Sequence, residues 1–222
     1  MRRKAFATPA CPVCLKNSLG KQFKKGLATY ATCSRCDLLF AVKYDDSFFT
    51  QNDKPESRAD YEIYNIILGR LENFRSKPIE SLLDFGCGRG DFFKYCSSVG
   101  IRSIGVDQNT EARASDLETG SFDAITLIEV IEHLPDPIKV FRELSGLLKQ
   151  GGIIYLESTF TDSIDNPMNH DYVDCSIGHI CIHSWSSLEK LGRMFGLKAF
   201  KLNDNVFILQ SAPKLSVSLR EF

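Results

Sequence analysis

The stretch of sequence that decides the fold is IESLLDFGCGRG, residues 79–90. Its first part, 79–85, is typical of a short apolar strand, and the glycine-rich turn at 86–90 leads into a helix-like DFFKYC segment. Strand, glycine turn and helix in this order open a nucleotide-binding α/β unit, because a turn without side chains lets a ligand touch the backbone at the helix start. A glycine turn alone is a weak signal, so the flanking sequence has to support it.

The next apolar segment, 101–106, runs directly into Asp107, 17 positions after Gly90. An acidic residue at the end of the second strand can bind both hydroxyls of a ribose. An acid that only caps the turn after the strand is the alternative. Together with the glycine turn, Asp107 favours a nucleotide-binding site.

Four stretches in a fixed order resemble the class I S-adenosylmethionine-dependent methyltransferases. They are LLDFGCGRG at 82–90, GVD at 105–107, SFDAITLIEVIEHL at 121–134 and LLKQGG at 147–152. The resemblance implies an enzyme with an α/β fold, built on a doubly wound, Rossmann-like sheet, with S-adenosyl-L-methionine as cofactor. A nicotinamide dehydrogenase would more naturally carry Gly-x-Gly-x-x-Gly.

The resemblance also implies which residues bind the cofactor. Asp84 and the glycine turn would hold the methionine end, Asp107 the ribose, and Ile128 with Glu129 would close the site beyond the fourth strand. The full predicted set is Asp84, Gly86, Cys87, Gly88, Gly90, Asp107, Gln108, Asp116, Leu117, Ile128 and Glu129.

Between the second and fourth strands the chain is shorter than the family pattern. Only the 14 residues 108–121 separate Asp107 from Phe122, which is barely one crossover. A helix or a strand must be missing, so we expect a sheet shortened at that edge and a more exposed adenine. Asp116 and Leu117 are candidates for the adenine side, and an inactive relative of the family is an alternative.

The segment 158–184 is long, irregular and contains three of the four histidines. Loops of this length are usually functional or disordered, and in a doubly wound fold this one leaves the carboxyl ends of the strands, where ligands bind. We interpret it as a lid over the methyl acceptor, with Tyr172 and His179 as wall residues. A surface loop with scattered histidines is the alternative. A helix at 186–195 and strands near 197–202 and 206–211 would complete the domain.

Methyl transfer from a sulfonium is an in-line displacement that alignment and exclusion of water accelerate. His133 is the candidate general base, since an imidazole titrates near neutral pH; a turn residue before Pro135 is the alternative. Glu129, Glu132 and His133 also resemble the Mg²⁺-binding Glu-x-x-Glu-His of ubiquinone-pathway and small-RNA O-methyltransferases. That resemblance implies a cation that polarises an acceptor hydroxyl, with a lid histidine as a further ligand. Glu-His at this position, after the strand, also occurs in methyltransferases of the family that use no metal.

Two CxxC pairs lie near the start of the chain, with 18 residues between them. A CxxC turn points two sulfurs at one centre, and a second turn completes the tetrahedral thiolate shell that Zn²⁺ favours. The closed shell leaves no position for catalysis, so its role would be to fold a small zinc ribbon. The predicted zinc ligands are Cys11, Cys14, Cys33 and Cys36.

The chain has 222 residues, 43% of them apolar and 25% charged, which excludes disorder and fibrous structure. Residues 1–44 carry nine Lys or Arg against one acid, or +8, which leaves −9 for 45–222. A basic module either meets an anionic partner or is a solvated lysine-rich surface. No window approaches the ~18 apolar residues of a membrane helix, so we expect a soluble, cytoplasmic protein without membrane contact.

These observations divide the chain into four parts: a zinc ribbon at 1–44, a linker and helix at 45–78, a methyltransferase domain at 79–211 and a tail at 212–222. The helix is expected over 57–75, where apolar residues recur at three- and four-residue steps. The favoured function is methylation of a small-molecule or sugar acceptor. An RNA methyltransferase that docks phosphates on the basic ribbon and a non-catalytic binding protein are the alternatives.

Overall fold

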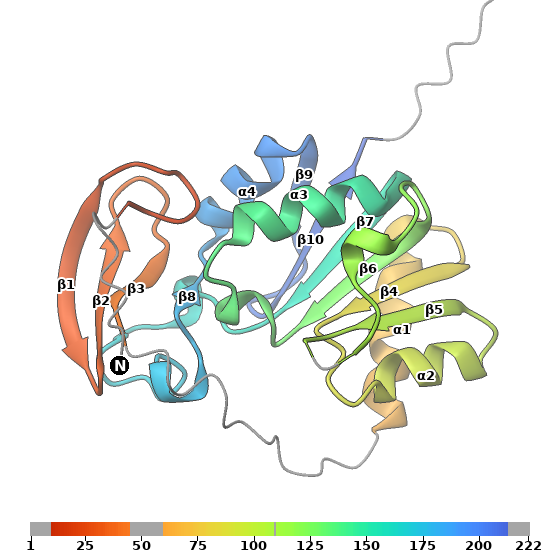
Figure 1. The fold of residues 1–222 in the computed structure, drawn as a ribbon, viewed down its shortest axis with the longest axis horizontal. Coiled ribbons are helices and arrows are strands. Elements are labelled where there is room, and N and C mark those ends of the chain that lie inside the picture. Colours follow the sequence, from red (N-terminus) through yellow and green to blue (C-terminus); the bar gives the residue numbers. More distant parts are fainter. Residues whose placement is uncertain (1–9, 45–59, 109, 213–222) are drawn as a thin grey trace, which may run out of the picture.

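The structure, a computed structural model, describes residues 10–44, 60–108 and 110–212. Most of the expected linker, at 45–59, and nearly all of the expected tail, at 213–222, lie outside this range. Six strands form the main sheet (Figure 1). They are β4 (Ser81–Phe85), β5 (Arg102–Val106), β6 (Phe122–Ile128), β7 (Leu148–Glu157), β9 (Leu197–Lys201) and β10 (Val206–Ser211).

The sheet has the order β5-β4-β6-β7-β10-β9. The first four strands are parallel, and β10 is antiparallel to both of its neighbours. Helices α1 (Tyr61–Arg75) and α2 (Asp91–Ser98) cover one face, and α3 (Pro137–Leu147) and α4 (Trp185–Met194) the other (Figure 1). The expected Rossmann-like α/β sheet, doubly wound, is therefore confirmed.

Side chains of the central strands alternate between the two faces. In β7, Ile153 and Tyr155 pack with the apolar faces of α1 and α2, whereas Ile154 and Leu156 pack with those of α3 and α4. This alternation is the two-residue period of a strand buried on both sides. It explains why the predicted strands read as continuous apolar runs.

The shortened edge of the sheet is also present. Strand β5 is the edge strand, and between it and β6 the described residues, which omit 109, contain only a 3-10 helix, Ala114–Asp116. No strand flanks β5 on its outer side in this part of the chain. The ligand-binding end of β5 is consequently covered by a loop instead of a further strand and helix.

The helix between β6 and β7 ends earlier than the sequence predicts. Apolar residues recur at helical spacing over 138–150, which predicts a helix that ends at Gly151 and Gly152, but α3 ends at Leu147 and β7 begins at Leu148. Leu148 already pairs with Phe122 of β6, and the register then shifts before Ile153. The glycines lie inside this irregular start of β7, because strand pairing replaces the helix three residues earlier than the apolar spacing indicates.

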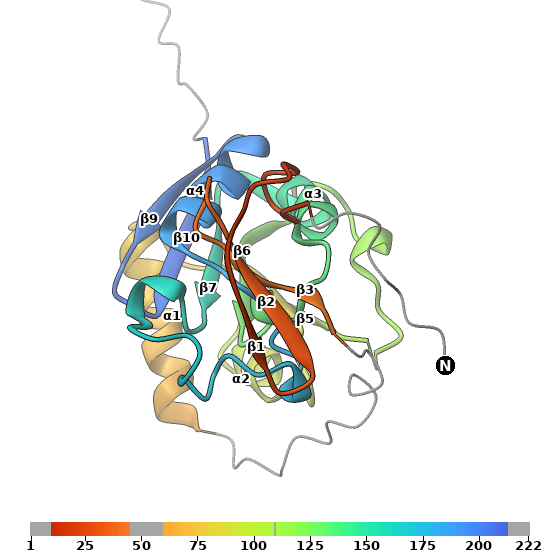
Figure 2. The same cartoon turned by 90° about the vertical axis from the view of Figure 1, so that its left-hand side faces the viewer.

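The N-terminal module is an antiparallel ribbon of β1 (Leu19–Lys25), β2 (Ala28–Cys33) and β3 (Leu39–Lys43). A fourth strand, β8 (Cys181–Ile182), comes from the segment between β7 and α4 and pairs with β3. Figure 2, which faces this side of the molecule, places the ribbon in front of the main sheet. Apolar residues of the ribbon and of the α3 and α4 face form one continuous core.

None of the described helices is both long and apolar enough to cross a lipid bilayer.

Candidate functional site

The glycine turn between β4 and α2 is tied to the end of β5. The backbone amides of Gly86 and Cys87 both donate to the carbonyl oxygen of Val106, over 2.7 and 3.2 Å. Gly86 has φ +79°, and a Cβ on it would lie 2.3 Å from Val130 Cγ2. Any residue other than glycine at this position would clash with Val130, in the segment after β6, so the close contact between the two segments requires glycine.

The carboxylate of Asp107 faces the same turn. Its Oδ2 accepts a hydrogen bond from the Gly88 amide over 3.1 Å. The Asp107 amide in turn donates to Thr110 Oγ1 over 2.9 Å, so the turn after β4 and the loop after β5 both hold the residue. The turn and the carboxylate therefore lie on the same side of the sheet, as a shared ligand requires.

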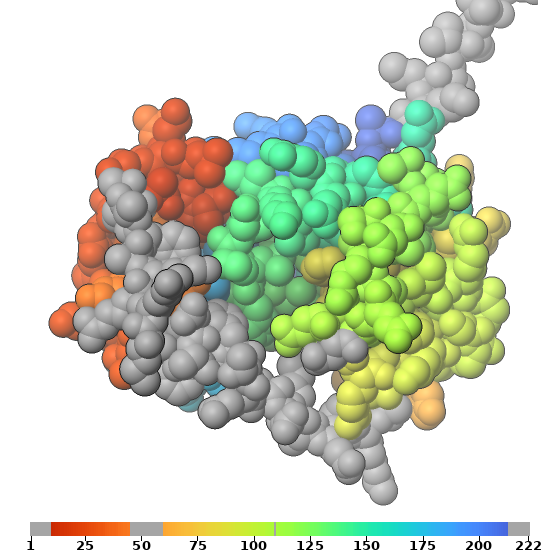
Figure 3. Space-filling model, in the orientation of Figure 1, coloured from red at the N-terminus to blue at the C-terminus, as the bar shows by residue number. Residues whose placement is uncertain are grey.

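A cleft of about 670 Å³ opens beside the turn, which is within the usual range for small-molecule sites. The surface in Figure 3 is hollowed between the segment that follows β5 and α3. The cleft-lining residues are Phe85, Gly86, Val106, Asp107, Gln108, Arg113, Ala114, Ser115, Glu129, Val130, His133, Leu134, Glu143, Ile177 and Gly178.

Four predicted cofactor residues line the cleft: Gly86, Asp107, Gln108 and Glu129. The roles of all the predicted residues stay predictions. On the side predicted for the adenine the lining residues are Ala114 and Ser115, directly before the predicted Asp116 and Leu117. The remaining predicted residues are not among those that line the cleft: Asp84, Cys87, Gly88, Gly90 and Ile128.

Asp84 is buried at the end of β4 and accepts a hydrogen bond from Thr126 Oγ1 over 2.9 Å. Burial raises the pKa of Asp84 to about 6, and the negative charge of Asp107 adds to the rise. A cationic ligand group brought next to Asp84 would favour its ionised form.

A second group of polar residues forms at the His133 end of the cleft. Glu132 and His133 belong to a 3-10 helix after β6, Ile131–His133, and His179 comes from the predicted lid. Nε2 of His133 and Nε2 of His179 each lie 3.8 Å from Glu132 Oε1. We call these three residues the acceptor-side cluster.

The carboxylate of Glu132 is fully buried. Its Oε2 accepts from Ser158 Oγ over 2.9 Å, but its Oε1 accepts no hydrogen bond from the described part of the chain. A buried carboxylate oxygen without a donor is costly unless a proton or a cation lies against it. This oxygen is the one on which the two imidazoles converge.

The tautomer of His179 follows from its other nitrogen. Nδ1 lies 2.7 Å from the carbonyl oxygen of Tyr172, which can only accept, so Nδ1 carries the hydrogen of the neutral ring. Nε2 then presents a lone pair toward Glu132 Oε1. Two lone-pair atoms facing each other need a positive charge between them, and an imidazole fixed through Nδ1 to a carbonyl is the usual arrangement of a metal-binding histidine.

Glu129 is joined to the acceptor-side cluster through Tyr172. The Tyr172 hydroxyl donates to Glu129 Oε2 over 3.1 Å and lies 2.8 Å from Ser158 Oγ. Desolvation of its carboxylate, together with the negative charge of Glu132, raises the pKa of Glu129 to about 7, and the hydrogen bond from Tyr172 opposes this rise. The structure thus brings together all four predicted acceptor-side residues, His133, Glu129, His179 and Tyr172.

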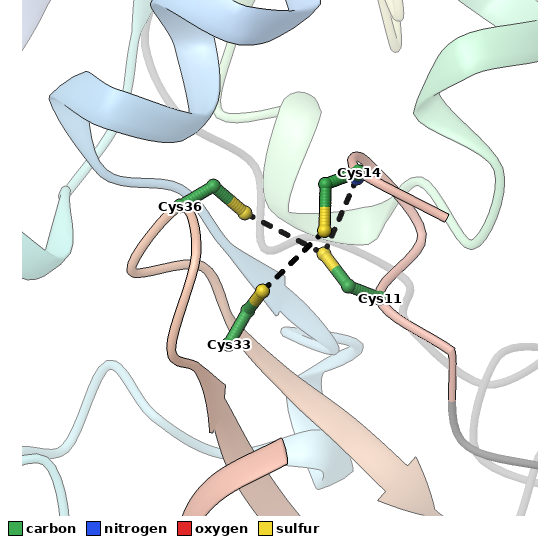
Figure 4. Close-up of side chains that lie close together, drawn as sticks. All are labelled: Cys11, Cys14, Cys33 and Cys36. Atoms are coloured by element: carbon green, nitrogen blue, oxygen red, sulfur yellow. Dashed lines mark hydrogen bonds between the residues drawn. The ribbon is translucent and has the colours of Figure 1, made fainter. Parts of the chain in front are cut away.

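The four N-terminal cysteines converge on one point (Figure 4). The Sγ atoms of Cys11 and Cys36 lie 3.5 Å apart and those of Cys14 and Cys33 3.6 Å apart, with no disulfide among them. Sulfurs bound to one Zn²⁺ at about 2.3 Å lie about 3.8 Å from one another in a tetrahedron. The spacing fits the predicted zinc site.

Both CxxC turns close in the same way, which explains why they point their sulfurs inward. The amide of Leu15 donates to Cys11 O and the amide of Asp37 donates to Cys33 O, each over 2.9 Å. Leu15 and Asp37 both have positive φ, near +56° and +52°. The two turns therefore present their cysteines to the same point through equivalent backbone geometry.

Sequence reasoning missed several cleft residues, namely Arg113, Ala114, Ser115, Glu143, Ile177 and Gly178. The first three lie in the shortened segment, where the family pattern gave no position to match. Ile177 and Gly178 directly precede His179 and were detectable as part of the lid.

The parallel sheet, the glycine turn and the carboxylate after the second strand define the class I methyltransferase fold. Comparison with protein-family models agrees, since residues 49–202 match the family described as "Methyltransferase domain". The match covers well over half of the chain, and the protein belongs to this family.

Similar proteins carry related names. The ubiquinone biosynthesis O-methyltransferase of Colwellia psychrerythraea is 33% identical over 106 residues, which are 37% of this chain and 43% of that protein. The chain thus spans less than half the length of the curated relatives it matches.

Among solved structures, a SAM-dependent methyltransferase from Archaeoglobus fulgidus has a TM-score of 0.50 at 21% identity, covering 75% of this chain and 100% of that one. The 1,6-didemethyltoxoflavin-N1-methyltransferase of Burkholderia thailandensis has a TM-score of 0.52 at 12% identity, and the match covers 87% of this chain and 100% of that one. At these identities the likeness shows the fold.

Proposed function

We propose that the protein is an S-adenosylmethionine-dependent O-methyltransferase with a small-molecule acceptor. The observation that carries this proposal is that Gly86 and Asp107 line the same cleft as Glu129 and His133. A cofactor held by the first two residues and an acceptor held by the second two would share that cleft.

The chain's own residues would bind and orient the cofactor at the β4 and β5 end. When bound, S-adenosylmethionine supplies an electrophilic methyl group on a sulfonium. Asp107 would accept hydrogen bonds from the ribose hydroxyls, and the buried Asp84 would favour the ammonium of the methionine end. The Gly88 amide already holds Asp107 in place, so little ordering is left for binding.

The acceptor-side cluster fits a divalent cation. Glu132 Oε1, His133 Nε2 and His179 Nε2 would be its ligands, and such a cation supplies Lewis-acid polarisation of an acceptor hydroxyl. Two imidazole nitrogens suit Mn²⁺, Co²⁺ or Zn²⁺ better than the Mg²⁺ expected from the sequence resemblance. His133 cannot use the same Nε2 as general base, so a ligand role for that nitrogen replaces the base role.

Two further residues orient this cluster. Ser158 holds Glu132 Oε2, and Tyr172 contacts Ser158, Glu129 and, through its carbonyl, His179. Partners of this kind fix the direction of ligand lone pairs.

A small-molecule acceptor is supported by the names of the curated relatives, which are ubiquinone biosynthesis O-methyltransferases. No comparison supports a nucleic-acid substrate, and the RNA alternative rests on the basic ribbon alone. A structural Zn²⁺ at the four cysteines belongs to the same proposal.

The test is transfer of a tritiated methyl group from S-adenosylmethionine to catechol, whose adjacent hydroxyls can chelate a bound cation. We expect transfer by the wild type with Mn²⁺ and at least a hundredfold loss in Glu132→Gln, with S-adenosylhomocysteine binding retained. Asp204→Asn, at an exposed surface ion pair, is the control. Undiminished transfer in Glu132→Gln contradicts the proposal.

A further inference from the structure

The backbone around His179 is shared by the cleft and the ribbon. On one side, the Ile180 amide donates to the carbonyl oxygen of Glu132 over 3.0 Å. On the other, the Ile180 carbonyl accepts from the Ala41 amide of β3 over 2.8 Å. The next two residues form β8 and pair with β3. The segment that carries His179 is therefore a strand of the ribbon sheet as well as a wall of the acceptor side.

A side chain of the ribbon contacts His179 directly. The hydroxyl of Tyr30, in β2, donates to the His179 carbonyl oxygen over 2.8 Å. Tyr30 is fully buried and its ring stacks on Phe23 with centroids 5.7 Å apart. Burial raises the pKa of Tyr30, so its hydroxyl stays protonated and remains a donor.

His179 is thus held at three points. Tyr30 binds its carbonyl oxygen, the Tyr172 carbonyl binds its Nδ1, and β3 binds the residue that follows. With the backbone and Nδ1 both fixed, Nε2 has one direction left, toward Glu132 Oε1. Removing the Tyr30 hydroxyl leaves a buried carbonyl without its donor, and the peptide can then rotate to find another.

We propose that the ribbon is part of the acceptor site and that Tyr30 is a positioning residue, which aims His179 Nε2 at Glu132 Oε1. The proposal rests on the proposed function, because it assigns His179 to the acceptor-side cluster. The four-cysteine module would then act on catalysis only by positioning a residue. The cysteines stabilise the fold of the ribbon, and the ribbon orients His179, which lies about 150 residues away in the chain.

Other contacts between the ribbon and the rest of the chain provide a matched control. Thr161 Oγ1 donates to Asp37 O over 3.4 Å, and Lys190 Nζ donates to Arg35 O over 3.1 Å. Both contacts bind the ribbon without touching His179. The double variant Thr161→Val/Lys190→Ala therefore loosens docking in general, whereas Tyr30→Phe removes only the bond to His179.

The experiment measures two quantities on the full, zinc-loaded chain: the Kd for Mn²⁺ by calorimetry and the hydrogen-exchange rate of the Ile180 amide. In Tyr30→Phe we expect a Kd for Mn²⁺ about tenfold higher and faster Ile180 exchange. Zinc content and the Kd for S-adenosylhomocysteine should stay at their wild-type values. The double variant should keep the wild-type Kd for Mn²⁺.

The outcomes separate this inference from the proposed function. If the wild type binds no Mn²⁺, the cation site is wrong, and Ile180 exchange alone decides whether Tyr30 positions the segment. Wild-type exchange together with wild-type Mn²⁺ binding in Tyr30→Phe overturns the inference, as does an equal loss in the double variant. If Tyr30→Phe does not fold, Phe23→Leu, which removes the ring stacked on Tyr30, is measured in its place.

Discussion

The Gly88 amide and the Asp107 carboxylate, from the ends of two adjacent parallel strands, are hydrogen-bonded over 3.1 Å. This contact brings the turn after β4 and the acid after β5 to one end of the cleft. It also fixes the carboxylate before any ligand arrives, so that ligand binding has little side-chain entropy to lose. The part of the cleft that we propose for the cofactor is therefore preorganised by the same two strands that begin the parallel sheet.

Asp84 makes the fold less stable at neutral pH. Because burial raises its folded-state pKa from 3.8 to about 6, its stabilising contribution is full below about pH 4 and is lost as the pH rises through 6. We predict that Asp84→Asn, which keeps an acceptor for Thr126, raises the free energy of unfolding at pH 7.5 by as much as about 3 kcal/mol and has little effect at pH 4. Thermal denaturation at both pH values measures this.

Asp123 provides a control, because its pKa is shifted in the opposite direction from that of Asp84. Burial favours its protonated form, but hydrogen bonds from Lys149 and Ser81 and the charge of Arg75 outweigh burial and lower its pKa. Its contribution is therefore present above the unfolded pKa and is lost in acid. Asp123→Asn should lower stability at pH 7.5. A destabilising effect of Asp84→Asn at that pH contradicts the account of Asp84.

Zinc should stabilise the whole described core, because the ribbon and the α3 and α4 face pack as one cluster. We predict that Cys33→Ser loses the metal and lowers the melting temperature in one cooperative step, by at least about 5 °C for a loss of ~2 kcal/mol. Metal analysis and calorimetry measure both. Cys87→Ser, which changes a thiol outside the four-cysteine group, should retain zinc. Two separate transitions in Cys33→Ser disagree with a shared core.

The acceptor-side cluster should make stability depend on a divalent cation. Mn²⁺ at a hundred times its Kd should add about 2.7 kcal/mol to the free energy of unfolding. Glu132→Gln removes the charge that faces both imidazoles, so it should abolish this increase. Glu189→Gln, at a surface ion pair, should leave the increase intact. An undiminished increase in Glu132→Gln places the cation elsewhere.

Local pattern was sufficient to predict that the glycine turn and Asp107 meet, because they lie close together in sequence and on adjacent strands. The length of the segment before Phe122 was sufficient to predict that a helix or a strand is missing there. The adenine side was not resolved to the residue: with no family position to match, the sequence favoured Asp116 and Leu117, whereas Ala114 and Ser115 line the cleft.

The partnership of the ribbon with His179 had no sequence signal at all. Strand β8 has two residues, and its pairing with β3 joins positions about 140 residues apart. Neither propensity nor period can indicate a strand this short, and the contact forms only after both parts have folded. For the same reason the sequence analysis treats the four-cysteine module as a separate part of the chain, although its sheet continues into the lid segment.

The most direct test of the central claim is calorimetric titration of the protein with S-adenosylhomocysteine, comparing the wild type with Asp107→Ala. We predict binding to the wild type and at least a tenfold higher Kd in Asp107→Ala, which is about 1.4 kcal/mol, with an unchanged melting temperature and with Asp204→Ala equal to the wild type. No heat with the wild type, or equal affinity in Asp107→Ala, contradicts the claim that the turn after β4 and the acid after β5 hold one cofactor.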